Sequence, residues 1–181
     1  KFKSKILVSI FINPKQFNKK SDFINYPRSM NKDIKILKNL KIDYVYIPNF
    51  RDIYNFKPKN QIYLNKFSKK LCGKFRKGHF EGVINVVNRF LEIIKPTYIY
   101  LGLKDFQQLT LIKKHIIKNR INTKVIECKT IREKNGVACS TRNFNLSKKD
   151  LEIASNIYKY LFNIKKKLKK KQNSFSLNKV K

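Results

Sequence analysis

Apolar residues recur along the chain in two alternating patterns. Short apolar runs occupy residues 6–12, 44–47 and 98–101, and residues 124–127, with Val and Ile at their centre, indicate a further short strand. Apolar residues repeat every three or four positions over residues 31–40, 79–94 and 106–118. The first pattern is typical of strands and the second of helices. Their alternation predicts an α/β fold of Rossmann type, a parallel sheet with helices on both faces. The near-continuous run Ile6 to Ile12 predicts a strand buried on both faces.

The last third of the chain changes character. Residues 131–143 predict a hairpin, because Asn135-Gly136 is a strong signal for a type I′ turn. A helical period then runs from Leu151 to Leu168.

The end of the chain is rich in lysine. The lysines around Leu168 and the polar residues that follow predict a disordered tail, because like charges at this density repel. We therefore expect an α/β domain over residues 1–147 and a C-terminal region over residues 148–181, which begins as a helix.

A large positive charge is the strongest feature of the composition. Lys+Arg number 43 against 11 for Asp+Glu, a formal net charge of +32, which normally indicates nucleic acid or an anionic membrane as a partner. Arginines are few and the lysines are dispersed, as A/T-rich coding would produce. We expect only non-specific electrostatic binding to nucleic acid, because base readers favour arginine forks.

Cysteine usage and hydropathy indicate the compartment. Cys72, Cys128 and Cys139 are odd in number and far apart in sequence, which favours free thiols and a cytoplasmic protein. No apolar run approaches the roughly 18 residues of a membrane span.

Polar residues follow the apolar run that ends at Leu101. Lys104 suits a phosphate, and Gln108 lies four residues later on the same helix face and suits a small polyhydroxy acid. Ligands bind at the carboxyl ends of strands in open α/β sheets. The alternative is a capping box, with Asp105 as N-cap and Gln108 reaching back.

Two further polar clusters resemble the first in their placement. Asn13 and Gln16 come directly after the first strand, although taken alone they are better explained by an ordinary Asn-Pro turn with a solvated Gln. Ser140, Thr141 and Arg142 follow the hairpin and suit a polyphosphate, or else form a polar loop that caps the helix starting near Ser147.

Taken in order, the motifs resemble one family. SIFINPKQF, DFINYPR, RKGHFEGVINVVNRF, YLGLKDFQQL and IREKNGVACSTRNFNLS follow the order and spacing of the pantothenate synthetases, or pantoate–β-alanine ligases. These are adenylate-forming enzymes of the nucleotidyltransferase type. The resemblance runs from about Ile6 to Ser147.

The resemblance implies a reaction and a set of site residues. ATP and Mg²⁺ would convert pantoate to pantoyl adenylate and pyrophosphate, and β-alanine would then displace AMP to give pantothenate. Gln16, Gln108 and Asn13 would hold pantoate and β-alanine. Asp33 matches a position associated with Mg²⁺. The ATP site would comprise Gly102, Leu103, Lys104, Asp105, Ile131, Cys139, Ser140, Thr141 and Arg142, of which Lys104, Ser140 and Arg142 would be catalytic.

The chain also departs from the family. Leu103 replaces the usual glutamate, and Thr141 replaces a serine. The first strand, the His-x-Gly-His phosphate motif and most of the small C-terminal domain have no match in residues 1–181, so we expect these residues alone to be inactive. The alternatives are a non-catalytic remnant of the ligase and a basic nucleic-acid-binding domain. The full-length family implies a homodimer.

Overall fold

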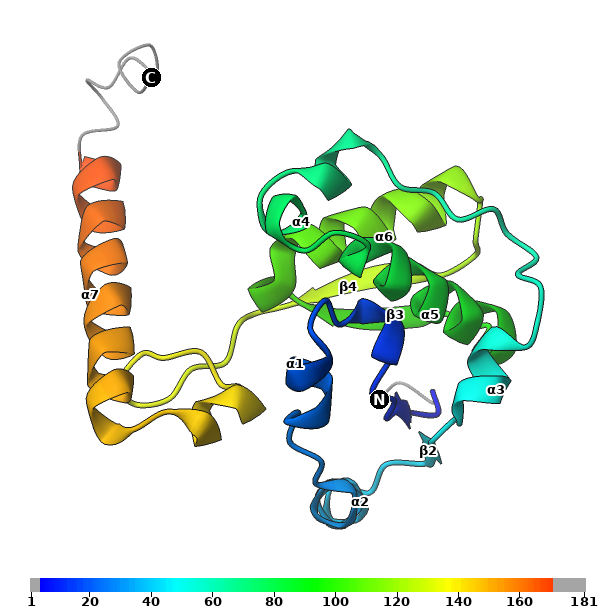
Figure 1. Ribbon diagram of the computed structural model, residues 1–181, viewed down its shortest axis with the longest axis horizontal. Helices are drawn as coiled ribbons and strands as arrows, with labels where there is room; N and C mark the ends of the chain where they lie inside the picture. The colour runs from blue at the N-terminus through cyan, green and yellow to red at the C-terminus, as the bar shows by residue number, and fades with distance from the viewer. Residues whose placement is uncertain (1–3, 171–181) are drawn as a thin grey trace. The chain divides into compact units, whose positions relative to one another are not determined.

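The computed structural model describes residues 4–170 (Figure 1). The chain divides into two compact units, one up to Lys129 and one from Thr130 onward. This division reflects packing within each unit. The functional boundary expected after Ser147 stays a prediction. Among the described residues, no helix is both long and apolar enough to cross a membrane.

The strands of the first unit form two parallel pairs. β1 (Leu7–Ser9) pairs with β2 (Tyr44–Tyr46), with Leu7 opposite Tyr44. β3 (Tyr98–Gly102) pairs with β4 (Lys124–Cys128), with Tyr98 opposite Lys124. Parallel strands need a crossover between them, and a helix supplies it in both pairs. The predicted parallel α/β class is confirmed.

The helices of this unit follow the predicted periods closely. The helix predicted over residues 31–40 is α2 (Met30–Asn39), and the strongest period is α5 (His79–Ile94). The period after the third strand is α6 (Phe106–Lys118), with the predicted bounds. Short helices complete the unit: α1 (Lys20–Ile24), α3 (Phe50–Tyr54), α4 (Cys72–Phe75) and the 3-10 turns η1 (Pro14–Gln16), η2 (Lys66–Lys69) and η3 (Leu103–Asp105).

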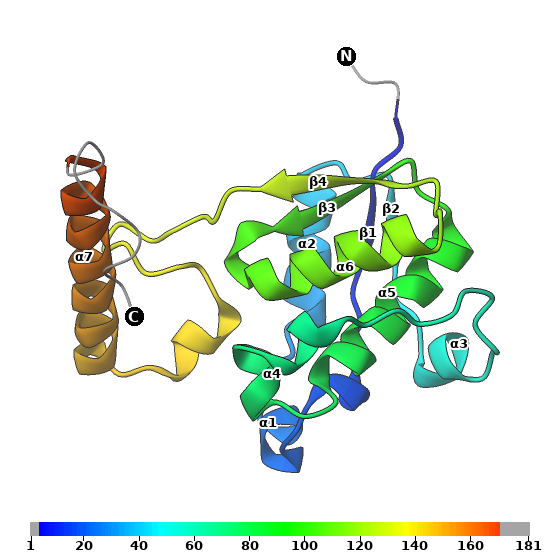
Figure 2. The same cartoon turned by 90° about the horizontal axis from the view of Figure 1, so that it is seen from above.

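The core forms where α5 and α6 pack on β3 and β4. In Figure 2 both helices lie on the same side of these strands. The strands contribute Ile99, Leu101 and Val125 to the contact. The buried residues at its centre are Phe80, Val83, Ile84, Leu91, Leu111, Ile112 and Ile116. Truncating one such side chain to alanine typically costs about 2–5 kcal/mol.

A buried polar network joins the same two helices. His115 and Asn88 are both fully buried, and the His115 Nε2 to Asn88 Oδ1 distance is 3.0 Å. The amide of Tyr63 donates to Nδ1 of His115 at 3.2 Å, which fixes the tautomer with the proton on Nε2. Burial lowers the pKa of His115, with Glu92 opposing that shift.

The faces of the strands are more open than the sequence predicts. β1 was expected to span residues 6–12 and to be buried on both faces, yet it covers three residues and Leu7 is 37% exposed. That expectation is wrong for this chain, because burial alternates along the strand: Leu7 and Ser9 are exposed and Val8 is half-buried. On β3 and β4, Tyr100 and Ile126 are exposed on the face opposite the helices.

The second unit begins with the predicted hairpin. Arg132 and Ala138 form its antiparallel bridge. The amide of Gly136 donates to the Glu133 carbonyl at 2.8 Å, and within this turn Gly136 has a positive φ, of 90°, while Asn135 does not. The expected type I′ turn is therefore wrong, because it would need a positive φ at Asn135 as well. The structure has instead a turn followed by a left-handed glycine.

α7 (Lys148–Lys170) packs against this hairpin. A Cβ on Gly136 would meet the Tyr158 ring, and Ser155 Oγ donates to the Asn135 carbonyl at 2.7 Å. The helix continues into the lysine-rich stretch that was expected to be disordered. Lysine is a good helix former and interacts favourably with the C-terminal end of the dipole, which offsets the mutual repulsion. The rest of the predicted tail, residues 171–181, lies outside the described residues.

Candidate active site

The first polar cluster forms a tight turn after β1. Asn13 is the N-cap of η1, and its Oδ1 accepts the amide of Lys15 at 3.1 Å. Asn13 is 1% exposed, and its Nδ2 donates to the Gly82 carbonyl at 2.9 Å. The predicted site residue Asn13 is thus buried and bonded to the protein itself, while Gln16 is half-buried on the turn that Asn13 caps.

The N-terminal end of α5 and the residues before it contact this turn. The Nδ1 of His79 donates to the Gln16 carbonyl at 2.7 Å, and Arg76 approaches the same oxygen at 3.5 Å. A Cβ on Gly82 would lie 2.5 Å from the Lys15 carbonyl oxygen, so only glycine permits this approach. The bond from His79 Nδ1 to the Gln16 carbonyl supports a structural role for His79, because it positions the backbone of Gln16.

The second polar cluster lies where β3 ends. Gly102, Lys104 and Asp105 are exposed, and Gln108 is half-buried in the first turn of α6. Asp105 occupies the N-cap position but makes no side-chain capping bond. The capping-box alternative is therefore wrong, and Gln108 makes no side-chain hydrogen bond within the described part of the chain.

Gln107 is the polar residue here that the sequence analysis missed. It is 7% exposed, and its Oε1 accepts the Cys72 amide at 3.1 Å. Its Nε2 donates to the carbonyls of Phe67 at 2.8 Å and Lys70 at 2.7 Å. Its spacing of four from Leu111 places it on the core-facing side of α6, which is the signal that could have revealed it.

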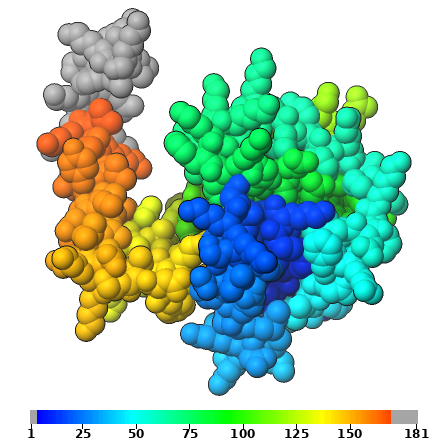
Figure 3. Space-filling model, in the orientation of Figure 1, coloured from blue at the N-terminus to red at the C-terminus, as the bar shows by residue number. Residues whose placement is uncertain are grey.

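Residues 66–79 connect the turn after β1, which carries Gln16, with the turn after β3, which carries Lys104. One end of this segment is fixed by Gln107, and the other reaches Gln16 through Arg76 and His79. Asn18 adds a bond from its Nδ2 to the Lys77 carbonyl at 2.6 Å. In Figure 3 the blue surface of the N-terminal segment adjoins the green surface of this segment. The structure thus links Gln16 to the turn that carries Lys104 and Gln108.

The third cluster lies in the second unit. Ser140 caps the 3-10 turn η4 (Thr141–Asn145), with its Oγ accepting the Arg142 amide at 3.3 Å. Thr141 and Arg142 are exposed. The helix α7 is capped by Ser147 and Asp150 instead, whose hydroxyl and carboxylate lie 2.6 Å apart. The alternative that residues 140–142 cap α7 is therefore wrong.

Ile131 and Cys139 face each other across the hairpin. The Cys139 amide donates to the Ile131 carbonyl at 3.0 Å, and the Cys139 thiol donates to Glu133 Oε1 at 3.3 Å. The residue Ile131 is 71% exposed.

Asp33 stands apart from other metal-ligating groups. It lies in the first turn of α2, where Oδ1 accepts the Ser29 hydroxyl at 3.0 Å. Within residues 4–170, no group of three or more His, Cys, Asp or Glu side chains could hold a metal ion. Asp33 by itself does not build a protein metal cage.

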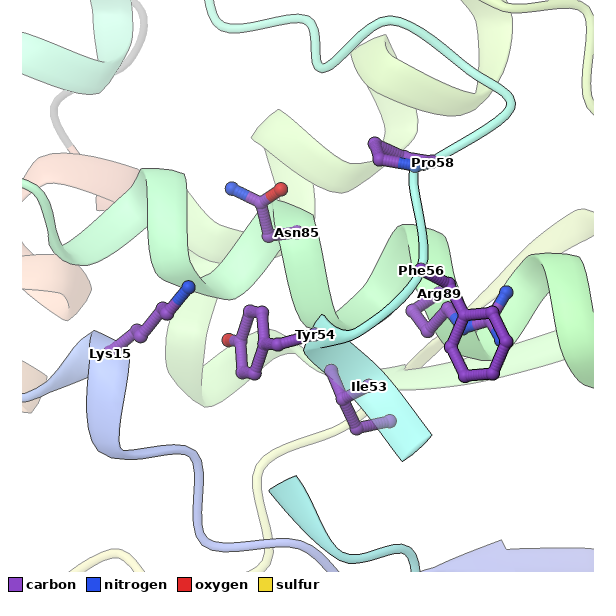
Figure 4. Close-up of a pocket in the computed structure, with 7 residues that line it drawn as sticks. All are labelled: Lys15, Ile53, Tyr54, Phe56, Pro58, Asn85 and Arg89. Carbon is purple, nitrogen blue, oxygen red and sulfur yellow. The ribbon is translucent and has the colours of Figure 1, made fainter. Parts of the chain in front are cut away.

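A small pocket lies beside η1, the turn that follows β1. It encloses about 200 Å³ and is lined by Lys15, Ile53, Tyr54, Phe56, Pro58, Asn85 and Arg89 (Figure 4). The Lys15 ammonium lies 3.9 Å from the centre of the Tyr54 ring. Tyr54 donates its hydroxyl to Asn13 Oδ1 at 2.6 Å. The pocket therefore borders the side chains that support the turn.

These features define an α/β protein with polar turns at the carboxyl ends of parallel strands. The family model of pantoate-beta-alanine ligase matches residues 1–181, and the chain belongs to this family. Pantothenate synthetases from Francisella tularensis subsp. novicida (strain U112) and subsp. tularensis (strain SCHU S4 / Schu 4) are each 43% identical over 162 residues, covering 86% of this chain and 60% of the relative.

Solved structures agree with the family. A pantoate-beta-alanine ligase from Francisella tularensis, complexed with beta-gamma ATP and beta-alanine, matches with a TM-score of 0.80 at 43% identity over 86% of this chain and 60% of that one. Pantothenate synthetase from Thermus thermophilus matches with a TM-score of 0.81 at 30% identity, over 87% and 58% of the two chains. The chain thus spans about 60% of the length of the curated relatives it matches.

Proposed function

We propose that this chain serves the ATP-dependent condensation of pantoate with β-alanine, which gives pantothenate, AMP and pyrophosphate. The observation that carries the proposal is the link between its two turns through residues 66–79. Gln16 and Gln108 both keep side-chain amides that are not used within the described part of the chain. Family membership supports the same reaction.

The first step forms pantoyl adenylate. Gln16 and Gln108 hold pantoate by its hydroxyl and carboxylate groups, and a carboxylate oxygen attacks the α-phosphorus of ATP. The bond from that phosphorus to the bridging oxygen breaks, and pyrophosphate leaves. Lys104 offsets the negative charge that develops on the phosphates, which favours the transition state over the ground state.

The remaining ATP contacts follow from the family resemblance. Gly102, Leu103 and Asp105 line the nucleotide near Lys104, and the Ile131 backbone contacts adenine. The loop of Cys139, Ser140, Thr141 and Arg142 wraps the phosphates, with Ser140 and Arg142 as catalytic donors. Arg142 suits this role because its planar fork can contact two phosphate oxygens together.

In the second step the amine of β-alanine attacks the acyl carbon of the adenylate. The bond from that carbon to the AMP oxygen breaks, AMP departs and the nitrogen loses a proton. Gln16 faces β-alanine as well as pantoate, so one turn aligns both reactants. Holding two reactants together supplies a large share of the rate enhancement in such condensations.

Mg²⁺ is proposed to arrive with ATP. Asp33 is a single carboxylate already bonded to Ser29, so it does not fit a dedicated protein cage. Mg²⁺ usually keeps several waters and is bound by substrate phosphates with one or two carboxylates. Asp33 stays a proposed contact to that complex, and no chemical step depends on it.

The proposal extends to the setting of the reaction. A reducing cytoplasm is proposed because Cys72, Cys128 and Cys139 are odd in number and far apart in sequence. A homodimer follows from the family resemblance. Lysine is dispersed along the sequence, so binding to DNA or RNA is proposed to be weak, non-specific and steeply salt-dependent. Tight, sequence-selective binding at physiological salt would favour a nucleic-acid-binding function instead.

The test is pantoate-dependent release of pyrophosphate from ATP by the natural protein that contains these residues. Pyrophosphate release should need pantoate but not β-alanine, whereas AMP release with pantothenate formation should need both acids. Binding of pantoate and ATP by the natural protein without any turnover would identify a non-catalytic remnant of the ligase.

A further inference from the structure

Asn13 has little capacity left for a substrate. Its Oδ1 accepts from both the Lys15 amide and the Tyr54 hydroxyl, and its Nδ2 donates to the Gly82 carbonyl. An amide oxygen has two lone pairs, so both are occupied. At 1% exposure the side chain is enclosed by the protein. Its geometry is that of a support for the turn.

Tyr54 reaches this support from a different element. It is the last residue of α3, and its hydroxyl lies 2.6 Å from Asn13 Oδ1. The Tyr54 hydroxyl can donate at neutral pH, because a tyrosine ordinarily has a pKa of about 10 and burial raises the pKa of Tyr54 further. We propose that Tyr54 is a positioning residue that acts through Asn13 to fix the turn presenting Gln16.

The position of Tyr54 is itself well determined. A capping box between Asn49 and Asp52 begins α3, and Arg89 of α5 donates from Nε to the Asp52 carbonyl at 3.2 Å. The ring is also half-enclosed by the pocket of Figure 4, where Lys15 lies over it. The tyrosine hydroxyl is therefore delivered from an anchored helix and not from a loose loop.

The route from Tyr54 to Gln16 is short. The Tyr54 hydroxyl fixes the rotamer of Asn13, and Asn13 Oδ1 then orients the Lys15 amide at the start of η1. The Gln16 amide in turn donates to the Asn13 carbonyl at 3.3 Å. A shift of Asn13 would therefore move both amides of the turn. That this positioning serves pantoate binding rests on the proposed function.

Amide hydrogen exchange of the 181-residue chain tests the positioning directly. Tyr54→Phe removes the hydroxyl and keeps the ring, so exchange of the Lys15 and Gln16 amides should accelerate by roughly three- to tenfold, the equivalent of one lost hydrogen bond. Core amides such as that of Ile112 should keep their rates. Tyr46→Phe is the matched control, because Tyr46 packs on Phe90 by its ring and its hydroxyl makes no hydrogen bond among the described residues.

Two results would overturn the proposal. One is an unchanged exchange rate at Lys15 and Gln16 in Tyr54→Phe. The other is an equal acceleration throughout α5 and α6, which would show a general loss of stability and not a local one. A double-mutant cycle adds a further criterion: Tyr54→Phe should have no additional effect on the Gln16 amide once Asn13→Ala is present.

Pantoate affinity of the natural protein separates this inference from the proposed function. Tyr54→Phe should weaken pantoate binding by a similar factor, and the loss should disappear in a Gln16→Ala background. If the unaltered protein binds no pantoate, the proposed function fails, while the exchange rates still decide whether Tyr54 positions the turn.

Discussion

The turns that follow β1 and β3 differ in how they are held in place and in what they expose to solvent. The first is fastened by the side chains of Asn13, Tyr54 and His79, and its backbone lies against Gly82. The second presents Gly102, Lys104 and Asp105 to solvent, and its N-cap makes no side-chain bond. One turn is fixed by tertiary contacts, and the other exposes its charged groups.

This difference indicates a division of labour. A turn fixed at its backbone can place one amide side chain accurately, which suits recognition of a small substrate. An exposed lysine at a strand end can meet phosphate charge that appears only as a reaction proceeds. Residues 66–79 connect the turn after β1 to the turn after β3. We expect changes in the first turn to alter substrate affinity and changes in the second to alter the rate of adenylation.

Lys104→Ala should have the largest effect on this comparison. The substitution should lower the rate of pantoyl-adenylate formation by about 10²–10³, or roughly 3–4 kcal/mol, while pantoate affinity changes much less. The reason is that Lys104 acts on charge that develops in the transition state. Single-turnover adenylation at varied pantoate concentrations, on the natural protein, measures both quantities.

Lys104→Arg is the companion variant. It should not restore the rate, because a planar guanidinium cannot occupy the place of a compact ammonium. An unchanged adenylation rate in Lys104→Ala would remove Lys104 from the site and leave the second turn without a catalytic role.

Gln107→Ala should produce the next largest effect, on stability. It would leave the Cys72 amide without its partner and would remove one of the two donors to each of the Phe67 and Lys70 carbonyls, at a cost of about 1–3 kcal/mol. Urea unfolding of the chain measures this loss. The neighbouring variant Gln108→Ala is the control and should change stability by no more than about 0.5 kcal/mol.

The same pair of variants separates the two roles in binding. Gln108→Ala should reduce pantoate affinity at least as much as turnover, because its amide contacts the substrate in ground and transition states alike. If Gln108→Ala were instead as destabilising as Gln107→Ala, the assignment of Gln108 to the substrate would fail.

Local patterns predicted the elements well and their burial poorly. α6 has the predicted bounds because its period, its polar start and its polar end all lie within the segment itself. The run Ile6 to Ile12 predicted a strand at the right place, but the strand is shorter, Leu7–Ser9, and one of its faces is exposed, because burial depends on tertiary packing. The lysine-rich end of α7 shows that intrinsic helix propensity can outweigh charge repulsion.

The site was predicted by residue type and not by contact. Asn13, Gln16, Lys104 and Gln108 were found because each follows a strand. The sequence could not show that Asn13 is enclosed by Tyr54 and Gly82, since those contacts span 41 and 69 positions. Gln107 was missed although its spacing of four from Leu111 places it on the core-facing side of α6. Its bonds to Phe67, Lys70 and Cys72 span 35 to 40 positions, so only the packed structure shows them.

Acidification should weaken the framework that both turns share. Burial lowers the pKa of His115 below its ordinary value of 6.5, so the unfolded chain binds a proton more readily than the folded one. Stability from this group is therefore complete above about pH 6.5 and declines as pH falls from there towards the lowered value. Urea unfolding between about pH 7.5 and 5.5 should show this decline. His115→Gln should reduce the slope, and an unchanged slope would assign the dependence to other groups.

Lys15→Gln should have the smallest effect. Its ammonium lies 3.9 Å from the Tyr54 ring centre, on the pocket side of the first turn. Loss of an exposed cation–π contact should cost about 0.5–1 kcal/mol in urea unfolding. Pantoate affinity should stay near that of the unaltered protein, because the Lys15 amide and the Asn13 support are retained. Gln16→Ala is the matched substitution one residue away and should weaken pantoate binding strongly. Equal losses of affinity in the two variants would mean that Lys15 also faces the substrate, and the first turn would then present charge as the second one does.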